Sequence, residues 1–106
     1  MHTNICLIGS TRFVEDFRKL EEDLSMKGYI VLSPLVYSQF GNNPKCGKHE
    51  KEILDFVQKE KIRQSDIVFV VDVNQYVGES TKNQIEYAEL LNKPLLYYSK
   101  DDLNKL

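Results

Sequence analysis

Two short stretches of the sequence combine glycine, hydroxyl-bearing and charged or amide residues in an order that suits anion binding. They read GSTR at residues 9–12 and GESTKNQ at residues 78–84. Each stretch follows an apolar run and precedes residues of helical period, so each stands where a strand would pass into a helix. Backbone N–H groups at a helix start bind anions, above all phosphate, and nearby hydroxyl and guanidinium groups strengthen that binding. Phosphate binding is therefore the first chemistry that the sequence indicates.

The first stretch consists of Gly9, Ser10, Thr11 and Arg12. We predict that it binds phosphate through its backbone N–H groups and the side chains of Ser10 and Arg12. In the alternative, Gly9 only permits the turn and Ser10 or Thr11 only caps the helix, while the arginine is solvated. The stretch is neither a Walker loop nor a dinucleotide fingerprint, so ATP or NAD binding by those modes is not predicted.

The second stretch repeats this arrangement, with Gly78 at the turn and the hydroxyls of Ser80 and Thr81 at the next helix start. Thr81 and Gln84 fit a capping box, in which the amide reaches back to the backbone of the N-cap residue. Gln84 also lies one turn before Ala88, on the helix edge nearest the core, so its side chain would equally point into a crevice. A carboxylate at that position could act as a nucleophile, whereas an amide cannot.

Acidic residues near the strand ends are the other candidates for chemistry. Ligands of an open parallel sheet bind outside the carboxyl ends of its strands, where Asp72 would accept hydrogen bonds from sugar hydroxyls. A turn-forming role for Asp72 is the alternative. Asp66 precedes the same apolar run and is expected to cap or to lie at the surface, and Glu79, Glu86 and His49 are expected to be solvated. No group of residues has metal-ligand spacing, so we expect neither a metal nor a cofactor.

Four short apolar runs, rich in β-branched or aromatic residues, predict strands that are covered on both faces. They are NICLIG (4–9), YIVL (29–32), DIVFVVDV (66–73) and PLLYYS (94–99). Three segments of helical period alternate with them, at 13–27, 49–64 and 81–92. This alternation predicts an α/β fold: a small doubly wound three-layer sandwich, Rossmann-like or flavodoxin-like, with four to five mainly parallel strands. At 106 residues, the chain is expected to form a single domain over 1–106.

Apolar residues at helical spacing predict the face that each helix buries. They are Phe13, Phe17, Leu20 and Leu24 in the first helix, Ile53, Phe56, Val57 and Ile62 in the second, and Ile85, Ala88 and Leu91 in the third. Gly28 stands where a helix C-cap is expected, and Asn92 and Pro94 are expected to end the third helix. The segment 33–48 contains two prolines and two glycines, so we predict a long loop of the kind that often closes over a ligand.

Charge and composition narrow the class of partner. Lys plus Arg (14) nearly balances Asp plus Glu (16), and no basic stripe is present, so no nucleic-acid partner is expected. The chain start lacks the pattern of a signal peptide, and no apolar window approaches the length of about 20 residues that spans a bilayer. We therefore expect a cytoplasmic protein without a membrane partner, in which Cys6 and Cys46 are reduced thiols.

Two segments together resemble the nucleoside 2-deoxyribosyltransferase superfamily, which includes the deoxynucleoside 5′-monophosphate N-glycosidases. They are ICLIGSTRF, at the chain start, and SDIVFVVDVNQYVGESTKNQIEYAELLNKPLLYYS, from Ser65 to Ser99. The resemblance implies a doubly wound fold that holds a nucleoside or nucleotide, and a helix-borne glutamate that attacks the anomeric carbon of the deoxyribose. It also implies a homodimer or a larger homo-oligomer in which subunits complete each other's sites.

The resemblance carries over to individual residues. The nucleophilic glutamate of the family falls on Gln84, and a tyrosine often found in the first strand falls near Cys6. An aspartate of the second helix falls near Gln58, with Asp55 one turn earlier. Phosphate would contact residues 9–12 and Ser80, while Asp72 and Gln84 would face the sugar.

Three hypotheses for function follow. The first is a nucleotide- or nucleoside-binding protein that cleaves or transfers at the N-glycosidic bond, with another acid in place of the lost nucleophile. Glu86 is a poor replacement because it points about 200° away from position 84 around the helix, and Glu79 would serve only if its loop folds inward. The second is a non-catalytic nucleotide-binding module in which Gln84 hydrogen-bonds a sugar or base. The third is a structural subunit in which both helix starts are simple caps.

Overall fold

The centre of the fold is a parallel sheet of four strands in the order β2-β1-β3-β4, seen in a computed structural model that describes residues 2–34, 47–103 and 106. The strands are β1 (Asn4–Gly9), β2 (Ile30–Leu32), β3 (Ile67–Val71) and β4 (Leu95–Tyr97). The helices are α1 (Val14–Met26), α2 (Lys48–Gln64), the short 3-10 helix η1 (Val73–Gln75) and α3 (Glu79–Leu90). Every strand pair is parallel, so every connection between strands crosses over the sheet.

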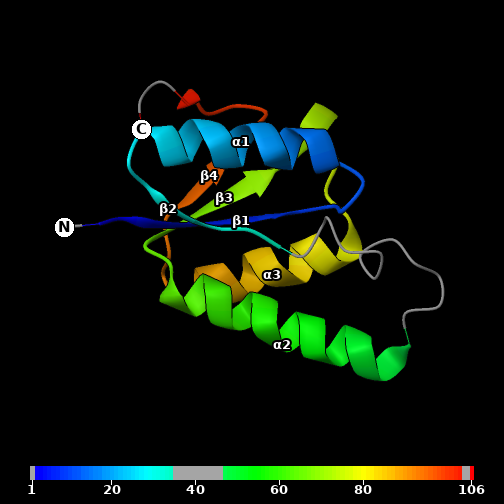
Figure 1. Ribbon diagram of the computed structural model, residues 1–106. Coiled ribbons are helices and arrows are strands. Elements are labelled where there is room, and N and C mark those ends of the chain that lie inside the picture. The colour runs from blue at the N-terminus through cyan, green and yellow to red at the C-terminus, as the bar shows by residue number, and fades with distance from the viewer. Residues whose placement is uncertain (1, 35–46, 104–105) are drawn as a thin grey trace.

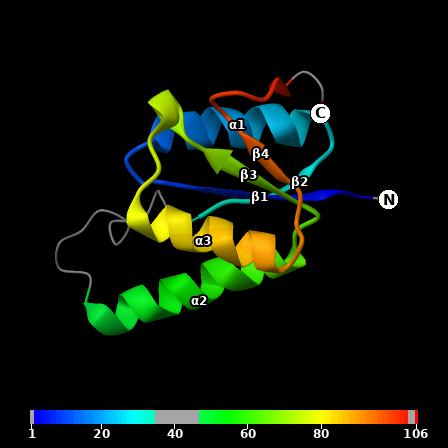
Figure 2. The ribbon, with the colours of Figure 1, turned by 180° about the vertical axis from the view of Figure 1, so that it is seen from behind.

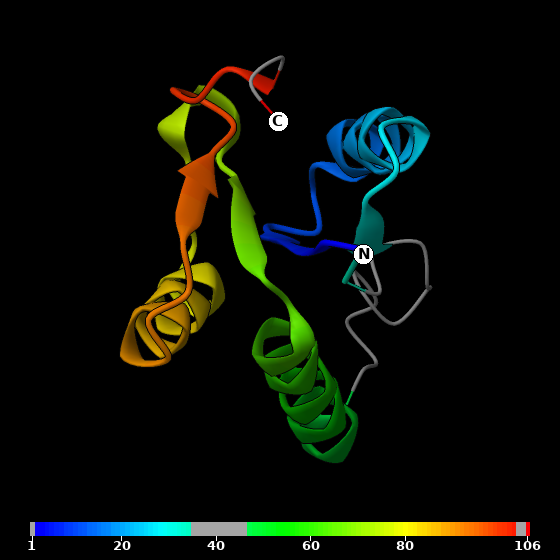
Figure 3. The same cartoon turned by 90° about the vertical axis from the view of Figure 1, so that its left-hand side faces the viewer.

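Helices cover both faces of the sheet: α1 lies on one face, and α2 and α3 lie on the other (Figures 1 and 3). Side chains of β1 alternate between these two layers, as a strand covered on both faces requires. Ile5 and Leu7 belong to the apolar cluster that includes α1, whereas Cys6 and Ile8 belong to the cluster that includes α2 and α3. All four side chains are fully buried. The predicted doubly wound α/β sandwich is thus confirmed, with four strands.

Two of the three connections from a helix to the next strand, α1–β2 and α3–β4, use a residue with positive φ. Gly28 has φ +92° and follows α1, and Asn92 has φ +58° and follows α3. After each helix, two N–H groups bond back to carbonyls of the last turn, from Gly28 and Tyr29 to Ser25 and Leu24 and from Asn92 and Lys93 to Glu89 and Ala88. This is the Schellman arrangement, for which glycine and asparagine are the favoured residues. The predicted helix ends at Gly28 and Asn92 are confirmed.

The prediction for the buried face of α2 was wrong for three of its four apolar residues. Ile53, Phe56 and Val57 are 48 %, 66 % and 38 % exposed, while Gln58 and Ile62 are buried. Around a helix of 3.6 residues per turn, positions 53 and 56 lie about 140° and 160° from position 58. The face that packs on the sheet therefore runs through the polar Gln58, which the apolar pattern could not indicate.

The described ends of the chain and its loops complete the fold. Leu103 and Leu106 pack against the apolar cluster that includes α1, so the tail returns to the α1 layer (Figure 1). Most of the predicted loop 33–48 lies outside the described residues, which resume at Gly47. Within the described part of the chain, no helix has the length and apolar character needed to cross a bilayer.

Candidate functional site

The carboxyl ends of β1 and β3 lie side by side in the sheet, with Gly9 opposite Val71. They mark the switch point of strand order, because the chain continues from β1 to β2 on one side and later returns to place β3 on the other. In doubly wound sheets, the crevice at this point is where ligands bind. The β1–α1 turn, η1 and the start of α3 all lie at this end of the sheet (Figure 2).

The predicted phosphate-binding turn at residues 9–12 is tight and closely packed. Gly9 has φ +155°, and a Cβ atom there would lie 2.8 Å from the carbonyl oxygen of Val71. The N–H of Phe13 donates to the carbonyl of Ser10 at 3.1 Å, and the N–H of Arg12 approaches the Ser10 hydroxyl at 3.4 Å. The N-cap residue of α1 is Phe13, and no side chain caps this helix. The alternative in which Ser10 or Thr11 caps the helix is therefore wrong.

Arg12 reaches from this turn to Tyr76, which stands between η1 and α3. Its guanidinium carbon lies 4.2 Å from the centroid of the Tyr76 ring, and Nη2 donates to the tyrosine hydroxyl at 3.2 Å. The edge of Tyr76 also meets Phe13, with ring centroids 5.9 Å apart and planes at 79°. The contact joins the predicted phosphate-binding turn at residues 9–12 to the loop that leads into α3. Tyr76 was not among the predicted site residues.

The second predicted stretch opens α3, which begins two residues earlier than predicted, at Glu79. Gly78 is the N-cap residue with φ −78°, and no side-chain hydrogen bond caps the helix. The predicted capping box of Thr81 and Gln84 is therefore wrong, because Thr81 stands at the third helical position rather than at the cap. A φ of −78° suits any residue, so the turn does not require glycine either.

Side chains along the first turns of α3 differ in their access to solvent. Ser80 is exposed, Thr81 is 4 % exposed and Gln84 is half-buried. Among the described residues, the amide of Gln84 has no hydrogen-bond partner. Gln84 thus keeps its polar group available in the second turn of the helix that starts at the switch point. The burial of Thr81 leaves Ser80 as the hydroxyl exposed at this helix start.

Asp72 directly follows β3, at the carboxyl edge where it was predicted. Its carboxylate accepts hydrogen bonds from the N–H of Ser99 at 2.9 Å and from the Ser99 hydroxyl at 2.7 Å, and the residue is 5 % exposed. In the turn after β3, the backbone carbonyl of Asp72 accepts from Gln75 at 2.8 Å. The side chain joins the ends of β3 and β4 instead of bonding to the backbone of its own turn, so the alternative of a turn-forming Asx side chain is wrong.

The remaining acidic candidates are placed as follows. Asp66 pairs with the start of β1, because its Oδ2 accepts the N–H of Asn4 at 2.8 Å. That contact is at the amino end of the sheet, away from the switch point, as predicted. Glu79 and Glu86 are exposed. At the last residue of β4, burial and the nearby charges of Glu89, Asp72 and Asp101 raise the pKa of the Tyr97 hydroxyl.

Cys6 and Gln58, which occupy two positions of the resemblance, meet inside the layer between the sheet and α2. The amide nitrogen of Gln58 donates to the carbonyl of Leu7 at 3.1 Å and approaches Cys6 Sγ at 3.6 Å. Burial raises the pKa of the Cys6 thiol from 9.0 to about 12, against the smaller opposing effect of the Lys61 charge. The thiol is therefore protonated and unreactive, and the amide of Gln58 serves packing.

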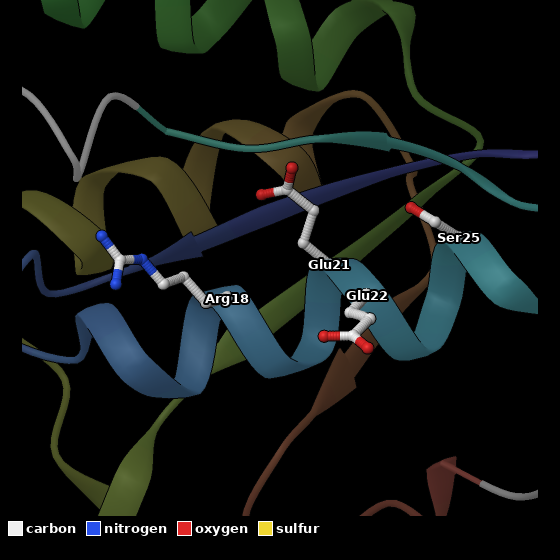
Figure 4. A pocket seen from close by; sticks show the side chains of 4 residues that line it. All are labelled: Arg18, Glu21, Glu22 and Ser25. Atoms are coloured by element: carbon white, nitrogen blue, oxygen red, sulfur yellow. The ribbon is translucent and has the colours of Figure 1, made fainter.

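A shallow hollow of about 430 Å³ lies elsewhere, along α1. Arg18, Glu21, Glu22 and Ser25 line it, all from that one helix (Figure 4). Arg18 pairs with Glu15 at 3.3 Å, and Glu21 accepts the hydroxyl of Ser33 at 2.9 Å. None of the predicted site residues contributes to this hollow. Within the described residues, no three His, Cys, Asp or Glu side chains gather as metal ligands would.

Comparisons with solved structures identify the architecture. A 2-deoxyribosyltransferase from the psychrotolerant bacterium Bacillus psychrosaccharolyticus superposes with a TM-score of 0.68, over 90 % of this chain and 71 % of that one. The chain has the fold of a 2-deoxyribosyltransferase. The two sequences are 19 % identical, so the likeness confirms the fold that the resemblance implied and leaves the roles of individual residues as predictions. No protein-family model matches the sequence, and no curated protein matches it.

Two residues of the site region escaped prediction, each for a different reason. Tyr76 lies in the loop DVNQYVGEST that leaves β3. The sequence did offer a signal for it, because it is an aromatic residue close to the second candidate stretch. Ser99 lies after the last strand, where nothing in the sequence indicates that its two donors meet Asp72. Both contacts join parts of the chain that are far apart, by 64 and 27 residues.

Proposed function

We propose that the protein binds a nucleoside or its 5′-monophosphate at the switch point, and that the chemistry suited to this site is cleavage or transfer at the N-glycosidic bond. The observation that carries the proposal is the contact of Arg12 with Tyr76. It joins the β1–α1 turn to the loop before α3, which supports a single site that both predicted phosphate-binding stretches would share. The fold shared with a 2-deoxyribosyltransferase described as a biocatalyst for nucleoside synthesis supports the choice of ligand.

The proposed placement of the ligand rests on the positive charge at the carboxyl edge of the sheet. The amino ends of α1 and α3 both face it, and helix amino ends favour negative charge. The phosphate would lie against the backbone of residues 9–12, the Arg12 guanidinium and the exposed hydroxyl of Ser80. The sugar would then face Gln84 and, through the lone pairs that Ser99 does not use, Asp72.

A second candidate function is binding without chemistry, and the identity of residue 84 favours it. The amide of Gln84 lacks the charge of a carboxylate nucleophile. Among the described acids nearby, Asp72 is buried against Ser99 and Glu79 is exposed in the first turn of α3. If neither acid takes over the role of a nucleophile at position 84, the protein would bind a nucleotide and leave its glycosidic bond intact.

We also propose that the protein works as a homodimer or a larger homo-oligomer. Ile53, Phe56 and Val57 lie close together on the outer side of α2 and are exposed in the single chain. Burial of such side chains between copies would be favourable by about 25 cal/mol for each Å² of apolar surface. Light scattering coupled to size exclusion tests this, and a Phe56→Glu variant that stays monomeric would locate the contact.

The experiment that separates the two functions measures base release by chromatography from the four deoxynucleosides and their 5′-monophosphates. It compares the natural protein with Gln84→Glu and with Asn83→Asp, a control that adds a carboxylate at an exposed neighbouring position of α3. Thermal unfolding with each ligand reports binding, because a ligand of the native state raises the melting temperature.

Each outcome of this experiment supports one of the two functions or refutes both. Base release by the natural protein would assign the chemistry to an acid other than residue 84. Release by Gln84→Glu alone would make the natural protein a binding module with an intact pocket. If no ligand shifts the melting temperature and no variant releases base, the proposed function is wrong.

A further inference from the structure

Arg12 is an exposed, positively charged side chain whose orientation is fixed by an aromatic ring. Its guanidinium carbon stands 4.2 Å from the centroid of the Tyr76 ring, and one of its nitrogens donates to the Tyr76 hydroxyl. Among the described residues, Arg12 has no acidic partner, so none of them compensates its charge. One N–H of five is used by the tyrosine, and the others can donate to a further acceptor.

Tyr76 is itself held in place from several directions. Phe13 packs against it at right angles, with ring centroids 5.9 Å apart, and the Tyr76 N–H donates to the carbonyl of Val73 at 3.0 Å. A Cβ atom at Gly78 would lie 3.5 Å from the Tyr76 hydroxyl, so the ring reaches over the N-cap of α3. The tyrosine therefore spans from the start of α1 to the start of α3.

The backbone that leads to Tyr76 adopts an unfavourable conformation. Asn74 and Gln75 have φ +54° and +65°, values that non-glycine residues seldom adopt. Such a conformation persists only where the surroundings determine it, and it is concentrated at functional sites. Here it lets the chain turn back after β3 and presents the tyrosine to the β1–α1 turn.

An arginine held in this way binds an anion at lower entropic cost. A free arginine loses rotamer freedom when it closes on a phosphate, whereas a stacked one has already lost much of it. Stacking on the ring leaves the charge of the guanidinium in place and its remaining N–H groups able to donate to an anion.

We infer that Tyr76 is a positioning residue, which holds Arg12 to receive the 5′-phosphate of a nucleotide and thereby makes the site selective for a deoxynucleoside 5′-monophosphate over the unphosphorylated deoxynucleoside. The inference rests on the proposed function and deepens it by naming the ligand class. It assigns the selectivity to a tyrosine that does not itself bind the ligand.

Titration calorimetry tests this with the four deoxynucleoside 5′-monophosphates and the four matching deoxynucleosides. The proteins are the natural chain, Tyr76→Ala, Tyr76→Phe, Arg12→Ala and the double variant of Arg12→Ala with Tyr76→Ala. Melting temperatures confirm that each variant is folded. Tyr76→Phe keeps the ring under the guanidinium and against Phe13, and so serves as the conservative control.

We expect Tyr76→Ala to weaken monophosphate binding about tenfold, from the lost stacking and the restored rotamer freedom of Arg12. Tyr76→Phe should retain most of that affinity. The double variant should bind no more weakly than Arg12→Ala, because the tyrosine acts through the arginine. Affinity for deoxynucleosides should be the same in all five proteins.

Other results would overturn the inference in distinguishable ways. An equal loss for phosphorylated and unphosphorylated ligands on Tyr76→Ala would make Tyr76 a general structural residue. Deoxynucleosides that bind the natural protein as tightly as monophosphates would refute the selectivity and leave the proposed function standing. Absence of binding by every ligand would refute the proposed function, and the role of Tyr76 with it.

Discussion

The Asp72 carboxylate is bound by both donors of Ser99, the backbone N–H at 2.9 Å and the hydroxyl at 2.7 Å. These bonds tie the residue after β3 to a residue beyond β4, at the edge where the ligand is proposed to bind. Asp72 is 5 % exposed, so this buried carboxylate holds the ends of β3 and β4 together. A carboxylate at such a position has further lone pairs for a sugar hydroxyl.

Removal of the Asp72 carboxylate is expected to destabilise the fold. Asp72→Ala should lower the free energy of unfolding by about 2–3 kcal/mol, since hydrogen bonds to a charged group contribute about 1.5–3 kcal/mol. Asp72→Asn should cost only about 1 kcal/mol, because the Ser99 hydroxyl can turn to accept from the amide. Urea denaturation measures both, with Ser99→Ala as a matched variant that loses the hydroxyl bond alone. Equal stability of Asp72→Ala and the natural protein would contradict the structural role.

Gln58 is the second buried polar residue whose replacement is informative. Its amide donates to the Leu7 carbonyl at 3.1 Å, and a carboxylate in its place would face that carbonyl without a proton. Gln58→Glu should therefore destabilise the protein by about 2–4 kcal/mol at pH 8, the cost of a buried unpaired charge. Burial raises the pKa of such a glutamate, so the loss should be smallest below about pH 4.3 and should grow as the pH rises.

The control for this variant lies one turn away on the same helix. Asp55 is exposed, and Asp55→Asn should change the free energy of unfolding by no more than about 0.5 kcal/mol. Urea denaturation between pH 4 and pH 8 compares the two. A Gln58→Glu protein with the stability and pH dependence of Asp55→Asn would show that position 58 is not buried against β1.

Gln58 also shows which part of the fold could not be predicted from the sequence. The strands were predictable because continuous apolar runs seldom form anything but buried strands in an alternating α/β pattern. The face of α2 was not, because its buried line passes through a glutamine while Phe56, at 66 % exposure, faces outward. A polar side chain that is buried by a hydrogen bond to β1 does not contribute to the apolar periodicity by which a buried helix face is predicted.

The candidate site was predictable in position but not in detail. Parallel strands bring their carboxyl ends to one edge, so the stretches 9–12 and 78–84 had to lie near it. The capping box failed because α3 begins at Glu79, and boundaries depend on packing that the local sequence does not record. The contact of Arg12 with Tyr76 spans 64 residues of chain, and no local pattern predicts a contact of that kind.

Cys6 is expected to make the stability of the protein sensitive to alkaline pH. Burial raises its pKa from 9.0 to about 12, so the protonated thiol favours the folded state below pH 9.0, and this contribution is lost as the pH rises toward 12. The free energy of unfolding should fall by about 1.4 kcal/mol for each pH unit above 9 from this group. Urea denaturation from pH 8 to pH 11 measures it.

Cys6→Ala is the reference for that measurement, because every other titrating group is common to both proteins and cancels in the difference. The natural protein should be more stable than the variant at pH 8, and its advantage should shrink above pH 9. Iodoacetamide at pH 8 should also leave Cys6 unmodified in the folded protein and modify it in urea, as mass spectrometry of peptides would show. A constant difference in stability across the pH range would refute the raised pKa.

Gly9 and Gly28 illustrate two different reasons why a position requires glycine: backbone conformation and lack of space for a side chain. Both have positive φ, but a Cβ at Gly9 would lie 2.8 Å from the Val71 carbonyl oxygen and 3.1 Å from the Phe17 ring, whereas a Cβ at Gly28 would meet nothing within 4 Å. Gly28→Ala should cost about 1–2 kcal/mol from backbone conformation alone. Gly9→Ala should cost about 2–4 kcal/mol, because β1 and β3 must also move apart or α1 must shift. Urea denaturation ranks the two, and a Gly9→Ala protein no less stable than Gly28→Ala would show that the edge of the sheet has room for a side chain at the switch point.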